Sequence, residues 1–85
     1  MRYEVAFLVD SKHSGQVTFL AHSSGALGPP YQFPDGNMFR QEVSFSCLEH
    51  FYNFLSRVNN EIGLNDENVF KLLYFHEYEK GDERA

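Results

Sequence analysis

Residues 46–63 read SCLEHFYNFLSRVNNEIG, and this stretch predicts one well-formed helix. Ser46 and Glu49 have the spacing of a capping box, in which the Ser hydroxyl accepts from the Glu49 amide and the Glu carboxylate reaches back to the Ser46 amide. Gly63 supplies the left-handed residue that commonly ends a helix. Apolar residues repeat between these ends at helical spacing, namely Leu48, Phe51, Tyr52, Leu55, Val58 and Ile62.

The segments before this helix have the composition of strands. Residues 3–9 are rich in β-formers, and residues 16–22 predict a returning strand after a polar loop that ends in Gly15. Residues 38–45 read as a further strand that leads directly into the helix.

The segment after the helix, residues 68–79, fits two structures. Asn65 or Asp66 could cap a helix there, but aromatic and β-branched residues with apolar positions on both faces favour a strand. We therefore expect a single α+β domain over residues 1–85, with a mostly antiparallel sheet in the chain order β-β-β-α-β packed against one helix.

Residues 23–37 form the least regular part of the chain, because three prolines and three glycines exclude a helix or a long central strand. A loop of this length tends to be functional when it is ordered. Within it, Pro34-Asp35-Gly36-Asn37 predicts a turn that folds residues 31–33 back on residues 38–40 as a hairpin. At the other end of the chain, residues 80–85 are charged and are expected to be frayed.

The charge of the chain is acidic, with a net value of −5. Most of it lies in the second half: residues 46–85 hold eight acids and four bases, a net of −4. No basic stripe is present, so we expect no direct binding to nucleic acid. An acidic surface suits solubility or a partner with a basic surface.

Several patterns bear on the compartment. The start of the chain lacks the pattern of a signal peptide, and the uncharged apolar run at residues 72–75 is too short to span a bilayer. The single cysteine, Cys47, excludes an internal disulfide. We expect a cytoplasmic protein that makes no membrane contact.

The residue types that carry chemistry do not form a recognisable site in the sequence. The four histidines, His13, His22, His50 and His76, have no metal-ligand spacing. Cys47 lies at the start of the helix without a base nearby in the sequence, and no glycine-rich phosphate loop is present. We predict no enzyme activity, metal or cofactor; a site that joins His50, His76 and their neighbouring acids remains an alternative.

Residues 29–34, PPYQFP, combine an extended backbone with two large rings. Such a segment can dock on a partner because little chain entropy remains to be lost. The alternative is that the two rings fold back as a lid on the core. The predicted contact residues are Pro29, Pro30, Tyr31 and Phe33, joined by Glu77 and Glu79, whose charges would attract a basic partner.

These observations predict a small non-enzymatic module that binds a protein partner and regulates or inhibits it. One alternative is a self-associating accessory or assembly subunit, in which a sheet edge or an aromatic patch forms a homodimer. Another is a small enzyme or ligand-binding protein. In size and charge the chain resembles inhibitors and immunity-type proteins from phages and mobile elements.

Overall fold

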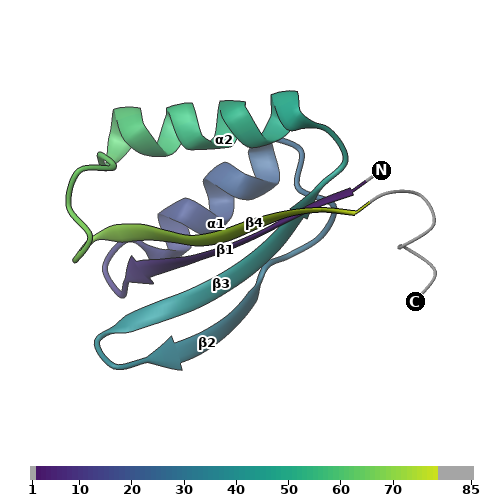
Figure 1. Ribbon diagram of the computed structural model, residues 1–85. Helices are drawn as coiled ribbons and strands as arrows, with labels where there is room; N and C mark the ends of the chain where they lie inside the picture. The colour runs from purple at the N-terminus through teal and green to yellow at the C-terminus, as the bar shows by residue number, and fades with distance from the viewer. Residues whose placement is uncertain (1, 79–85) are drawn as a thin grey trace.

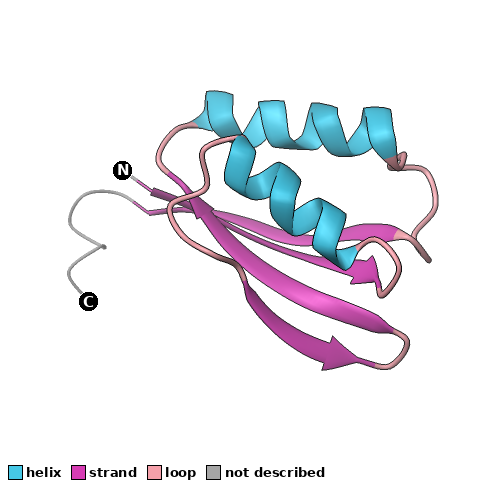
Figure 2. Ribbon diagram, turned by 180° about the vertical axis from the view of Figure 1, so that it is seen from behind, coloured by secondary structure: helices cyan, strands magenta, loops and turns pink. Residues whose placement is uncertain are grey.

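Over the residues that the structure describes, the fold is an antiparallel four-stranded sheet with two helices on one of its faces (Figures 1 and 2). It is seen in a computed structural model that describes residues 2–78. The elements follow the chain as β1 (Arg2–Asp10), α1 (Ser14–Ser23), β2 (Tyr31–Asp35), β3 (Met38–Phe45), α2 (Leu48–Glu61) and β4 (Phe70–Tyr78). The sheet order is β2-β3-β1-β4. This is the topology called ferredoxin-like, which hosts many unrelated functions.

The α+β class and the antiparallel sheet are confirmed, but the predicted order β-β-β-α-β with one helix is wrong. Residues 14–23 form a helix where a returning strand was expected. Val17, Leu20 and Ala21 are spaced i, i+3 and i+4 and are all buried, whereas Phe19 is 63% exposed. The β-branched residues at 17 and 18 favour a strand, but this preference is weak, and packing against the sheet outweighs it.

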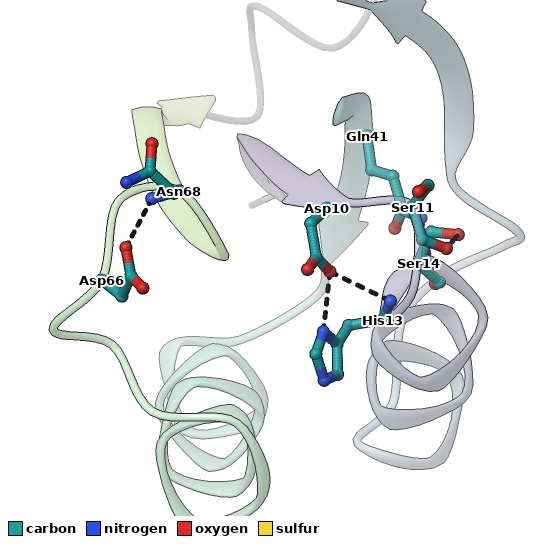
Figure 3. A network of polar contacts seen from close by, with 7 residues as sticks. All are labelled: Asp10, Ser11, His13, Ser14, Gln41, Asp66 and Asn68. Atoms are coloured by element: carbon teal, nitrogen blue, oxygen red, sulfur yellow. Dashed lines mark hydrogen bonds and ion pairs between the residues drawn. The ribbon is translucent and has the colours of Figure 1, made fainter. Parts of the chain in front are cut away.

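The chain turns from β1 into α1 at Asp10 (Figure 3). One carboxylate oxygen of Asp10 accepts a hydrogen bond from the His13 amide at 3.0 Å and lies 2.7 Å from the His13 ring Nδ1. Asp66 makes a similar turn before β4, where its carboxylate accepts from the Asn68 amide at 2.9 Å. The polar turn formed by Asp10 and His13 therefore leads into a helix, where the sequence predicted a hairpin loop between two strands.

The second helix is confirmed, but its cap is not. Gly63 has a φ of 94°, as the predicted stop requires. The N-terminal cap is Cys47 in an extended conformation, and no side-chain hydrogen bond among residues 2–78 caps the helix. The capping box predicted at Ser46 and Glu49 is therefore wrong, and Ser46 does not cap the helix.

The core lies between the helices and the sheet. Phe7 of β1 stacks on Phe70 of β4 at 5.0 Å between ring centroids and packs on Phe54 of α2 at 5.6 Å. The predicted helix stripe is shifted: Phe54 is fully buried, while Leu48 and Tyr52 are 36% and 60% exposed. Together the buried core side chains come from all elements except β2.

The hairpin and the last strand follow the sequence prediction. Asp35 pairs with Met38, and Gly36 between them has the positive φ, 64°, that two-residue hairpin loops favour. Residues 70–78 form a strand, so the helical alternative is wrong. A bulge opposite Ala6 and Phe7 leaves Leu73 as an extra residue, which breaks the side-to-side alternation.

Two further statements concern the described residues. No helix among them is long and apolar enough to cross a membrane. The tail predicted to be frayed, residues 80–85, lies outside the described part of the chain.

Candidate protein-binding surface

The predicted contact residues Tyr31 and Phe33 lie on β2, one of the two edge strands. Tyr31 pairs with Glu42 and Phe33 with Arg40, which places both rings on the face of the sheet that the helices leave open. Tyr31 is 73% exposed and Phe33 is 46% exposed. The alternative that these rings form a lid on the core is therefore wrong.

The predicted acidic part of the site lies elsewhere. Glu77 is on β4, at the opposite edge of the sheet, and pairs with Tyr3 on the helix side. Three strand spacings separate β4 from β2, roughly 14 Å. Burial, followed by the nearby carboxylate of Glu77, raises the pKa of Tyr3. Glu79 lies outside the described residues, so the structure does not bring an acidic group from this strand to the two rings.

Pro29 and Pro30 lead into β2 and line a groove of about 420 Å³. The segment before them is fixed to β3, because the Leu27 amide donates to the Ser44 carbonyl at 2.8 Å and Ala26 forms a bridge with Phe45. The groove is bounded by further side chains from β1, β2 and β3, among them Arg2, Tyr31, Glu42 and Ser44. We call Leu27, Pro29, Pro30, Tyr31, Phe33 and this groove the β2 surface.

Two cations lie close to the β2 surface. Arg40 forms an ion pair with Glu42, with 3.1 Å between Nε and the carboxylate oxygen. Arg2 stacks over the ring of Tyr78, 4.9 Å from the ring centroid, and no carboxylate within residues 2–78 is paired with it. The guanidinium of Arg2 thus lines the groove as a positive group that is not neutralised by a described neighbour.

Beside the groove, Tyr74 and Tyr78 form a tyrosine layer around Glu4 on the helix-free face. One carboxylate oxygen of Glu4 accepts from the hydroxyl of Tyr74 at 2.9 Å and from that of Tyr78 at 3.3 Å. Burial, followed by the Glu4 carboxylate, raises the pKa of Tyr74 to about 12. These bonds hold β4 to β1 and fix the floor beside the groove.

A second cleft, of about 440 Å³, lies where the end of α1 meets α2. Arg57 Nη1 donates to the hydroxyls of Ser23 at 2.7 Å and Ser24 at 3.2 Å, at the carbonyl end of α1, where a cation is favourable. Gly25 has a φ of 101°, and a Cβ built on it would lie 2.5 Å from Nδ1 of His50. This arrangement joins the two helices, and the negative end of α1 disfavours an anion there.

The alternative site built from His50 and His76 is not formed. His50 lies on α2, whereas His76 pairs with Glu4 on the other side of the sheet and packs against Tyr78, with ring centroids 4.2 Å apart. Among residues 2–78 no three His, Cys, Asp or Glu side chains are grouped closely enough to hold a metal ion.

The sequence predicted the two rings and the two prolines as contact residues but not Arg2, Leu27 and Glu42, which line the groove only because the strands pair. No protein-family model, curated protein or solved structure matches the chain. The function proposed below therefore follows from the surface of the molecule.

Proposed function

We propose that this protein is a small non-enzymatic module that binds a protein partner through the β2 surface and thereby regulates or inhibits that partner. One observation carries the proposal: Tyr31 and Phe33 are exposed on an edge strand in which every residue is exposed. Neither ring belongs to the core. Two large rings left in water without a packing role are typical of a contact surface.

The geometry of β2 lowers the conformational-entropy cost of such a contact. Tyr31 and Phe33 are held by pairing with β3, so their backbone loses little freedom when a partner binds. The strand has five residues and contains Pro34, which has no amide hydrogen to offer a partner strand. We therefore expect side chains, rather than an added strand, to make the contact.

The groove beside the rings sets the chemistry of the partner. Leu27, 57% exposed, and the two prolines give it an apolar rim, while Arg2 supplies hydrogen-bond donors. A partner segment with an apolar side chain next to a carbonyl or carboxylate would pack on this rim and accept hydrogen bonds from Arg2. The net charge of −5 adds long-range attraction to a basic protein, even though Glu77 lies at the other edge.

An exposed aromatic strand also suits stacking on single-stranded nucleic acid. That mode needs a basic groove that follows the phosphate backbone, and Arg40 on this face is already paired with Glu42. A protein is therefore the favoured partner.

Photocrosslinking in the cells that make the protein tests this proposal directly. A photoreactive phenylalanine analogue replaces Tyr31 in one variant and Phe19 in a control, because Phe19 is 63% exposed on α1 and lies outside the β2 surface. We expect a discrete adduct from position 31 that protease destroys and nuclease leaves intact, and no such adduct from position 19. Equal labelling at both positions, no adduct, or an adduct destroyed by nuclease would overturn the proposal.

A second variant separates binding from folding. Phe33→Ala in the chain that carries the photoreactive group at position 31 should weaken the adduct about tenfold, since a central interface ring commonly contributes 1–2 kcal/mol or more. Its melting temperature should stay within a few degrees of the parent, because Phe33 is outside the core.

A further inference from the structure

The segment that leads into β2 departs from regular pairing with β3. Tyr31 pairs with Glu42, and the next bridge between the two segments joins Ala26 to Phe45. Five positions separate Ala26 from Tyr31, whereas three separate Glu42 from Phe45, so two extra residues loop out from the sheet. The loop-out contains Pro29 and Pro30, which have no amide hydrogen to give to a strand.

This loop-out leaves a gap in the pairing of β3. Within residues 2–78, Val43 and Ser44 have no partner on the β2 side. The Ser44 carbonyl accepts from the Leu27 amide at 2.8 Å. Because the amide and carbonyl of one residue in an antiparallel strand point to the same side, the Ser44 amide points into the gap. The groove of about 420 Å³ lies here, since Val43 and Ser44 line it together with residues 27–31.

Arg2 supplies the positive charge of this groove. Its guanidinium lies 4.9 Å from the ring centroid of Tyr78, and its Nε is buried with no acceptor among residues 2–78. The other charged residue that lines the groove, Glu42, is paired with Arg40 at 3.1 Å. A guanidinium and a backbone amide beside one groove are the donors that bind a carboxylate.

We infer that the groove binds the C-terminal end of the partner protein. The terminal carboxylate accepts from Arg2 and from the Ser44 amide, and an apolar last side chain packs on Leu27 and Pro29. This inference rests on the proposed function and names the part of the partner that the β2 surface binds. A carboxylate at the end of an otherwise basic protein suits both the cation in the groove and the net charge of −5.

The gap favours a chain end over an internal segment. Pairing resumes on both sides of it, at Tyr31 with Glu42 and at Ala26 with Phe45, so a partner chain cannot run through it along the edge of β3. A terminal residue carries its carboxylate and its side chain on one Cα, so a single residue reaches the donors and the apolar rim. An internal acidic residue needs a second residue to fill the rim.

Three small probes test the inference without the partner. Acetyl-leucine has a terminal carboxylate beside an apolar side chain, acetyl-leucinamide lacks the carboxylate, and acetyl-glutamyl-leucinamide carries its carboxylate on a side chain. Each is titrated into the isotope-labelled full chain, and amide resonances are followed by NMR. Acetyl-leucine should shift the amides of Leu27, Tyr31 and Ser44 in a saturable way, in the millimolar range expected for so small a ligand. The other two probes should bind about tenfold more weakly or less.

Variants at Arg2 show which group holds the carboxylate. Arg2→Gln should weaken acetyl-leucine about tenfold, and Arg2→Lys about threefold, because lysine keeps the charge but loses the planar fork. Lys71→Gln is the matched control: Lys71 pairs with Leu8 on the same helix-free face but does not line the groove, so binding should not change. Thermal melts show that each variant is folded.

Equal shifts from all three probes, no shift in the groove, or acetyl-leucine binding that survives Arg2→Gln would overturn the inference. Binding of acetyl-glutamyl-leucinamide as tight as that of acetyl-leucine would overturn the assignment to a chain end. Crosslinking from position 31 uses none of these probes. An adduct from position 31 without acetyl-leucine binding would leave the proposed function standing and refute the chain-end inference alone.

Discussion

Gln41 is a polar residue on an apolar strand face, and its contacts in the structure explain its presence there. In the sequence it interrupts an apolar strand face, and in the structure it is fully buried beneath α1. Its amide nitrogen donates towards the Ser14 carbonyl at 3.2 Å, the Thr18 hydroxyl at 3.0 Å and the Gln32 side-chain oxygen at 2.7 Å. Two amide hydrogens thus serve α1 and β2 from a single position on β3.

We predict that Gln41→Ala lowers the free energy of unfolding by about 2 kcal/mol or more, because it removes these bonds and leaves a small cavity. Gln32→Ala should cost less, since Gln32 is exposed. Chemical denaturation of both variants measures the difference. Equal stability of Gln41→Ala and the parent would mean that the buried amide does not hold α1 to the sheet.

Tyr74 gives a prediction about pH. Its pKa is raised to about 12 by burial and then by the Glu4 carboxylate, so the folded state holds the phenol proton more tightly than the unfolded state does. The stability from this group is therefore complete below pH 10, the ordinary tyrosine pKa, and is lost as the pH rises to about 12. Ultraviolet titration should show a late-ionising phenol that Tyr74→Phe removes. Glu4→Gln should make it ionise earlier, and a phenol unmoved by Glu4→Gln would contradict this assignment.

At the scale of elements, the sequence identified strands β1, β3 and β4, the β2 hairpin and helix α2, but not helix α1. The α1 sequence contains no acidic residue in its first turn, and its N-terminal cap, His13, makes no side-chain capping bond. A ten-residue helix without such signals is marginal alone, so its structure comes from packing on the sheet.

The same limit applies to the candidate site. Tyr31 and Phe33 could be found because prolines and a turn surround them. The separation of Glu77 from them follows from the sheet order, which no local pattern contains. Arg2 and Glu42 reach the groove for the same reason.

A pair of substitutions tests the helical structure of α1. Leu20→Ala should lower the free energy of unfolding by about 2–5 kcal/mol, since Leu20 is 1% exposed. Phe19→Ala, one residue earlier and 63% exposed, should change it by less than about 0.5 kcal/mol. In a strand, Phe19 would share a face with the buried Val17, so the reverse order of the two effects would contradict the helix.

At the scale of the whole molecule, the protein is a two-layer domain whose two sheet edges differ. Both helices cover one face (Figure 2), which leaves the other face with its tyrosine layer open. The β2 edge is short and presents rings, whereas the β4 edge is long and presents backbone groups and apolar side chains. We assign the first to a protein partner.

Photocrosslinking from position 31 tests most directly the central claim that the β2 surface binds a protein. We predict a discrete adduct from position 31 that protease destroys and that Phe33→Ala weakens, and no such adduct from the control position 19. Equal labelling from positions 31 and 19, or an adduct that nuclease destroys, would contradict this claim.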